Sequence, residues 1–147
     1  MKRLIAAAFA AGLLFTGGTA MAATVEVKMV NKGHDGHSMS FEPGIITANV
    51  GDTIKFVAVD KFHSIESIDE MLPAGVAPFA GQLNKDFEVK LEKPGVYGIK
   101  CTPHMTMGMI GLIVVGGDKS NLDAVKKGSA ILEGKAKERM DALFGQL

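Results

Sequence analysis

Apolar and polar residues alternate along short stretches of this chain, and that alternation restricts the possible folds more than any other feature of the sequence. Between residues 25 and 29, valine or methionine alternates with glutamate or lysine, and residues 54–58 and 87–91 repeat the pattern. Because successive side chains of a strand point to opposite faces, a period of two predicts strands with one buried face. Glycine, proline, asparagine and aspartate cluster between these stretches and predict turns. The sequence therefore predicts a mainly β fold, of the β-sandwich type.

Two later stretches predict further strands. Tyr97, Ile99 and Cys101 share one face of a predicted strand. Lys100 lies on the opposite face, so the thiol of Cys101 is predicted to point into the core. Residues 111–116 contain only apolar residues and glycine, which predicts a central strand buried on both faces.

The end of the chain predicts two helices. Ser120 and Asn121 are suitable caps for a short helix that Gly128 can end. From residue 132 to 147, apolar residues recur every three or four positions, which predicts an amphipathic second helix. We expect both helices, over about residues 120–147, to pack on the sandwich.

The start of the chain predicts a secretory signal peptide over residues 1–22. Two basic residues precede an apolar run over 4–15, and small residues follow as far as Ala22, so we expect cleavage after Ala22 or Ala23. The run is too short for a permanent membrane span. Residues 23–147 would then form a single domain in the periplasm, with no membrane insertion.

The size and charge of the mature chain exclude some classes of function. Cleavage would leave 14 basic residues against 16 acidic ones, a formal charge near −2 that argues against a nucleic-acid partner. About 125 residues usually form one compact domain. We expect a monomer.

A cluster of soft-metal ligands carries the functional signal. Cys101 is the only cysteine, and in an exported protein an unpaired thiol needs an explanation such as a metal ion. His104 and Met109 follow it closely, and His63 lies far upstream. A thiolate, two imidazoles and a weak thioether form the ligand set of blue-copper electron-transfer sites, and zinc gains little from methionine. We therefore predict one copper ion that cycles between Cu(II) and Cu(I).

The identity of the thioether ligand is less constrained than that of the other three. Met105, Met107 and Met109 all follow His104, and spacing alone does not decide between Met107 and Met109. We favour Met109 because it lies next to the strand that starts at Gly111 and can return under the loop. Met105 and Met107 would then form an apolar surface around His104.

Short motifs along the whole mature chain resemble those of the pseudoazurins, a family of periplasmic cupredoxins. The motifs are Cys101–His104 with Met109, Pro94–Gly98, Gly108–Leu112, Asn31–Gly33, Phe41–Pro43, Gly51–Thr53 and Asp60–Lys61. The resemblance implies a Greek-key β-sandwich with two C-terminal α-helices that binds one type 1 copper through the four ligands named above. It also implies a carrier of single electrons in denitrification, with copper-containing nitrite reductase as acceptor and c-type cytochromes as candidate donors. Plastocyanins share the ligand spacing but normally lack the two helices.

The resemblance also implies how electrons leave the protein. His104 would be the exit, within an apolar surface that includes Met39, Pro103, Met105 and Met107. A rim of lysines would steer an acidic partner, and its candidates are Lys32, Lys61, Lys85 and Lys100.

The chain departs from the usual pattern of the family around the first ligand. Pseudoazurins usually have Gly-His-Asn-Val where this chain has Phe62-His63-Ser64-Ile65. In the family the asparagine amide bridges toward the residue equivalent to Thr102, and we expect the Ser64 hydroxyl to be too short for that contact. Ser64, Thr102 and Pro103 are the candidate residues that support the ligands.

Two other functions fit the sequence less well than electron transfer does. Nine methionines suggest a copper chaperone or storage protein, but a buried cysteine ligand between strands suits retention of the ion. A multicopper enzyme would need additional His-x-His pairs, which the sequence lacks. His34 and His37 could bind a second metal, although a solvated loop is the simpler interpretation.

Overall fold

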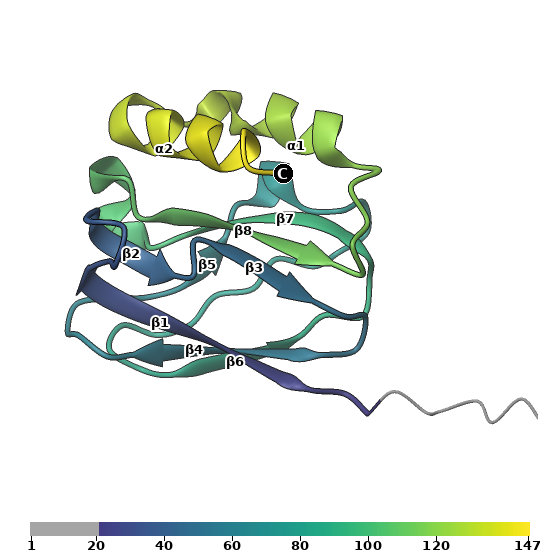
Figure 1. Cartoon of the computed structure of the whole chain (residues 1–147), viewed down its shortest axis with the longest axis horizontal. Coiled ribbons are helices and arrows are strands. Elements are labelled where there is room, and N and C mark those ends of the chain that lie inside the picture. Colours follow the sequence, from purple (N-terminus) through teal and green to yellow (C-terminus); the bar gives the residue numbers. More distant parts are fainter. Residues whose placement is uncertain (1–20) are drawn as a thin grey trace, which may run out of the picture.

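The computed structural model describes residues 21–147, which form two four-stranded sheets and a layer of short helices (Figure 1). Residues 1–20 of the predicted signal peptide lie outside this range. The strands are β1 (Thr24–Lys32), β2 (Ser38–Glu42), β3 (Ile45–Ala48), β4 (Thr53–Ala58), β5 (Glu66–Ser67), β6 (Phe87–Lys90), β7 (Gly95–Lys100) and β8 (Ile110–Val115). The helices are η1 (Asp69–Met71), η2 (Thr102–Met107), α1 (Leu122–Gly128), η3 (Ser129–Ile131) and α2 (Gly134–Phe144).

The two sheets pack face to face around the main core. One has the strand order β2-β1-β4-β6 and the other β3-β8-β7-β5, with parallel pairs β1/β4 and β3/β8. Buried residues from both sheets, such as Phe41, Phe56 and Ile113, belong to one hydrophobic cluster. The predicted mainly β sandwich is confirmed.

Strand β8 is buried on both faces, as the apolar run over 111–116 predicted. Ile113 and Val115 belong to the core between the sheets, whereas Leu112 and Val114 belong to a second cluster beneath the helices. Because its side chains alternate between the two faces of the sheet, this central strand contributes to both hydrophobic clusters.

The two C-terminal helices cover the outer face of the second sheet, with α2 against β8 and α1 against β7 (Figure 1). One detail of the prediction was wrong. The Asn121 side chain does not cap α1 but accepts a hydrogen bond from the Val96 amide and donates one to the Val96 carbonyl. Helix α1 ends at Gly128, as predicted, and the 3-10 helix η3 follows directly.

Gly128 is also required by close packing. A Cβ built on Gly128 would lie 1.9 Å from the carbonyl oxygen of Glu70 in η1. The chain therefore needs a residue without a side chain where the helical layer crosses η1.

The segments that carry the predicted ligands come from different sheets. His63 lies in the connection from β4 to β5, Cys101 directly follows β7, and His104 lies in η2 between β7 and β8. The β1–β2 loop and η2 lie at the same end of the molecule (Figure 1).

Candidate metal centre

Three predicted ligands bring their donor atoms together. His63 Nδ1 lies 3.2 Å from His104 Nδ1, and Cys101 Sγ lies 3.6 Å from the His104 nitrogen and 3.9 Å from the His63 nitrogen. Among residues 21–147, these three form the one cluster of at least three His, Cys, Asp or Glu side chains with metal-binding geometry. Segments separated by almost forty residues thus meet at one point.

The donor triangle has the size that a transition metal requires. A point equidistant from three atoms with these separations lies about 2.1 Å from each, against about 2.0–2.1 Å for zinc–nitrogen and about 2.3 Å for zinc–sulfur bonds. A thiolate with two imidazoles is also a donor set that copper prefers. The residues therefore fit the copper ion of the cupredoxins.

Asn31 fixes the orientation of the His63 ring. Its Oδ1 lies 3.0 Å from His63 Nε2, so the imidazole donates its Nε2 proton to the amide oxygen and leaves Nδ1 free for the cluster. In the sequence, Asn31 was predicted only as part of a motif of the resembled family. A polar residue at the end of a strand does not by itself indicate a role in a metal site, and the partner of Asn31 lies 32 residues away in the sequence.

Cys101 is fully buried and points into the sandwich core, as strand parity predicted. The backbone N–H of Ser64 donates to its sulfur at 3.4 Å. Burial raises the pKa of the Cys101 thiol, and burial together with the nearby His104 lowers the pKa of His63. In the absence of a cation the site therefore favours a neutral thiol and neutral imidazole, and a bound metal would favour the thiolate.

The ligand loop is short and tightly bonded. The His104 amide donates to the Cys101 carbonyl, the Met109 amide to the His104 carbonyl, and the Cys101 amide to the Met109 carbonyl. Pro103 stands at the start of η2, where its fixed φ suits the helical turn. Gly108 ends η2 with a φ of 92°, a conformation that glycine adopts without strain.

Met109 and Met107 have opposite environments. Met109 is fully buried and packs in the same core cluster as Cys101, whereas the side chain of Met107 is 45% exposed. Burial next to the cysteine favours Met109 as the thioether ligand.

Thr102 has a different partner from the one expected in the family. Its hydroxyl donates to the carboxylate of Glu66, and Lys100 Nζ lies 3.6 Å from the other oxygen of that carboxylate. Within the described residues, no hydrogen bond joins Ser64 to Thr102. Glu66 was not identified from the sequence, because its contact depends on the pairing of β5 with β7.

The surface around His104 is partly apolar. His104 is half-buried, Pro103 and Met107 are exposed, and Met39 is half-buried against the core. Met105 is half-buried against the cluster beneath the helices. Of the methionines beside the site, Met107 therefore offers the largest free surface.

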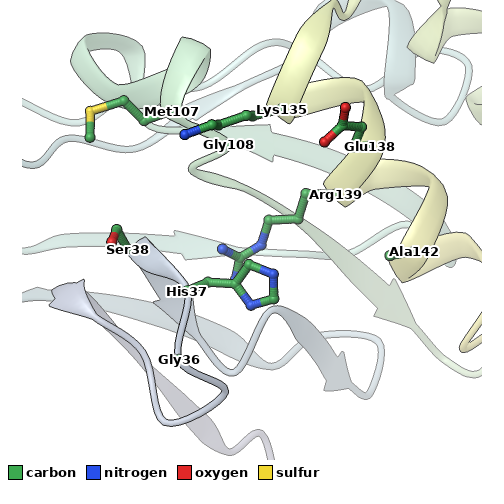
Figure 2. Close-up of a pocket in the computed structure, with 9 residues that line it drawn as sticks. All are labelled: Gly36, His37, Ser38, Met107, Gly108, Lys135, Glu138, Arg139 and Ala142. Atoms are coloured by element: carbon green, nitrogen blue, oxygen red, sulfur yellow. The ribbon is translucent and has the colours of Figure 1, made fainter.

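A pocket of about 420 Å³ adjoins the ligand loop where η2 meets the β1–β2 loop and α2 (Figure 2). Arg139 projects from α2 into it, and its guanidinium lies 3.4 Å from the Asp35 carboxylate. Met107 and Gly108 of the ligand loop also line it. Helix α2 thus supports both loops at this end of the molecule.

Some of the lysines and histidines around the site form ion pairs, and others do not. Lys32, Lys61 and Lys85 are exposed and make no ion pair within the described chain, whereas Lys100 pairs with Glu66. In the β1–β2 loop, His34 bonds to Glu42 and His37 to Asp35, and neither histidine joins a metal-binding cluster among the described residues.

Known proteins share this fold and sequence. The family described as "Copper binding proteins, plastocyanin/azurin family" matches residues 25–116. A pseudoazurin from Paracoccus pantotrophus is 48% identical over 141 residues, which cover 96% of this chain and 95% of that protein. The crystal structure of a pseudoazurin from Hyphomicrobium denitrificans matches with a TM-score of 0.78 and 41% identity over 84% of this chain and 98% of that chain. A copper-containing nitrite reductase from Thermus scotoductus matches with a TM-score of 0.50 and 28% identity over 69% of this chain and 24% of the enzyme.

Proposed function

This chain belongs to the plastocyanin/azurin family of copper-binding proteins and, within it, to the pseudoazurins, and from that premise we propose its cellular role. It is a one-electron carrier with one copper ion, and it is not an enzyme. We propose that it works in the periplasm and donates electrons to a copper-containing nitrite reductase. Its proposed ligands are His63, Cys101, His104 and Met109. The convergence of two Nδ1 atoms and one Sγ within 3.9 Å is the observation that supports this most strongly.

Copper would supply the change between Cu(II) and Cu(I), and the protein's task is to keep its own donors still during that change. Asn31 holds the His63 ring, the Ser64 amide holds the Cys101 sulfur, and three backbone hydrogen bonds close the ligand loop. Ligands that are fixed by a supporting shell have little to reorganise. His63 and Cys101 are fully buried, which excludes water from that side of the site.

His104 is the proposed exit for the electron. It is the most exposed of the three converging ligands, and Pro103 and Met107 beside it provide apolar surface. A small contact of this kind favours rapid release over high affinity, which suits a shuttle. Lys32, Lys61 and Lys85 are proposed to guide an acidic partner toward this surface, and Lys100 contributes less because Glu66 offsets its charge.

The proposed location in the periplasm depends on the predicted signal peptide over residues 1–22. Within residues 21–147, no helix has the length and apolar character needed to cross a membrane.

Addition of Cu(II) to the metal-free protein tests the proposed site. We expect intense absorption near ~600 nm that reductant bleaches and oxidant restores, as in blue-copper centres. Cys101→Ser should remain folded by circular dichroism and lose the band. Met109→Leu should shift the reduction potential, and the matched variant Met107→Leu should leave it unchanged.

A colourless copper complex of the wild type would contradict the type 1 site and favour a Cu(I) chaperone or storage protein. The acceptor is tested separately, by mixing reduced protein with a copper-containing nitrite reductase and following the return of the blue colour. A failure of electron transfer with an intact blue site would contradict only the proposed partner.

A further inference from the structure

Phe62 directly precedes the ligand His63, and its aromatic side chain faces solvent. It is 64% exposed, more than any other large hydrophobic residue of the described chain except Met21. An isolated exposed apolar residue is common on protein surfaces, so exposure alone carries little information.

The backbone of Phe62 gives the exposure more meaning. Its φ is 70°, in the left-handed region that bulky residues rarely adopt. Glycine, which the pseudoazurins usually have here, adopts this conformation without strain. The fold therefore does not require an aromatic residue at this position, and it tolerates one at a cost.

The backbone of Phe62 is tied to Asn84, which also bonds to the backbone of His63. The Phe62 amide donates to Oδ1 of Asn84, and the Asn84 amide donates to the His63 carbonyl. An aromatic side chain on so constrained a backbone loses little conformational freedom on contact with a partner, which favours binding.

The surroundings of Phe62 resemble a docking surface. Val59 lines the same hollow as Phe62 and is 54% exposed, and Leu83, next to Asn84, is 49% exposed. Exposed Lys61 is adjacent in sequence.

The exposed lysines near Phe62, unlike the neighbouring aspartates, are not engaged by other groups of the described chain, so they can contact acidic groups of a partner. The carboxylates of Asp60 and Asp86 accept backbone N–H groups of Asn31 and Ala58. Lys61 and Lys85, each adjacent to one of these aspartates, have no ion-pair partner among residues 21–147.

We propose that Phe62 is an apolar anchor for the redox partner, inserted into an apolar recess within an acidic surface of that protein. It extends the docking surface from His104 across to the His63 side of the copper site. This inference rests on the proposed electron-carrier function and assigns a specificity-determining contact that the glycine of related proteins would not make.

Stopped-flow oxidation of the reduced protein tests the anchor. The protein reaction uses a copper-containing nitrite reductase, and the small probe is hexacyanoferrate(III), in which Cu(I) loses one electron and Fe(III) gains it. Reduction of the oxidised protein by an acidic c-type cytochrome, the other predicted redox partner, supplies a second protein reaction. We expect Phe62→Gly and Phe62→Asn to slow the protein reactions about three- to tenfold, the size of a lost aromatic contact.

The small-probe rate and the blue absorption band should remain at wild-type values in both variants. Phe62→Leu should keep most of the protein rate, and Ile131→Ser should change nothing, because Ile131 is 54% exposed on the helical layer. A Phe62→Gly rate equal to or above wild type, in whichever protein reaction the wild type performs, overturns the inference. A wild type that is blue but does not react with the reductase contradicts the proposed acceptor, and the cytochrome reaction then decides on Phe62.

Discussion

At the scale of single residues, the ligands depend on neighbours that are distant in the sequence. Asn31 reaches His63 across 32 positions, and Glu66 reaches Thr102 across 36. Each contact joins a polar side chain to a ligand or to the residue next to one. The precision of the site therefore depends on tertiary contacts as well as on the motif between Cys101 and Met109.

Removal of the Asn31 amide should weaken copper binding. Asn31→Leu leaves Nε2 of His63 without its acceptor, so we expect copper affinity to fall about 10- to 100-fold, as for other outer-shell contacts. Copper transfer to a chelator measures this. Thr47→Leu, at an exposed position of β3, is the control, and equal copper affinities in both variants would contradict the role of Asn31.

Glu66 replaces the asparagine amide that the family usually places next to Thr102. We expect Glu66→Ala to speed copper loss, because the Thr102 hydroxyl then loses its acceptor beside Cys101. Ser64→Asn in the Glu66→Ala background should restore slow loss if the amide reaches Thr102. Copper-loss kinetics of the two single variants and the double variant form the test, and additive effects would show that the two positions are independent.

At the scale of elements, the sequence predicted what depends on local pattern and missed what depends on packing. Alternation predicted the buried face of β1, and an uninterrupted apolar run predicted the two buried faces of β8. The soft-metal residue types predicted the three side chains that converge, His63, Cys101 and His104. The short strands β2 and β3 were not predicted, because they switch from one sheet to the other at a stretch that resembles a plain turn. Asn121 looked like a helix cap, yet its side chain bonds to β7.

Packing of the helical layer on η1 should be sensitive at Gly128. We expect Gly128→Ala to lower the free energy of unfolding by about 1–3 kcal/mol, because the added methyl group collides with the Glu70 carbonyl. The control is Gly145→Ala, where the nearest atom to the new Cβ lies 3.5 Å away, and its effect should stay within about 0.5 kcal/mol. Urea unfolding of both variants measures the difference, and equal stabilities would refute the packing argument.

Asp52 ties the start of β1 to the β3–β4 turn. Its carboxylate accepts N–H groups of Ala23 and Asn49, each at 2.8 Å, and these hydrogen bonds lower its pKa. The carboxylate therefore stabilises the fold above the ordinary carboxyl pKa of about 3.9, and this contribution is lost as pH falls through the lower folded-state value.

Asp52→Asn should accordingly be less stable than the wild type near neutral pH, and the difference should shrink in acid. Urea unfolding of the metal-free proteins across the acidic range measures it, since ligand protonation is then common to both. Asp123→Asn, at an exposed position of α1, is the control. A stability difference that stays constant with pH would contradict the role of the Asp52 charge.

At the scale of the whole molecule, the free lysines should matter for the rate of association. We expect electron transfer to an acidic reductase to slow as salt rises, because charges are screened over about 10 Å at 0.1 M. Replacement of Lys61 and Lys85 by glutamine should flatten that dependence. Lys127→Gln should leave the salt dependence unchanged, because Lys127 is exposed on α1, which lies away from η2 (Figure 1). A rate that is independent of salt in the wild type would remove the lysines from the mechanism.

The proposed copper ligands and the residues that orient them come from both sheets of the sandwich. Asn31 lies near the end of β1 in one sheet, and Cys101 follows β7 in the other. His63 lies on the β4–β5 segment, which crosses between the two sheets. A bound ion would therefore link the two sheets to each other. Release of the ion would be limited by how often those layers separate, so the lifetime of the coloured protein would report directly on transient separation of the two sheets.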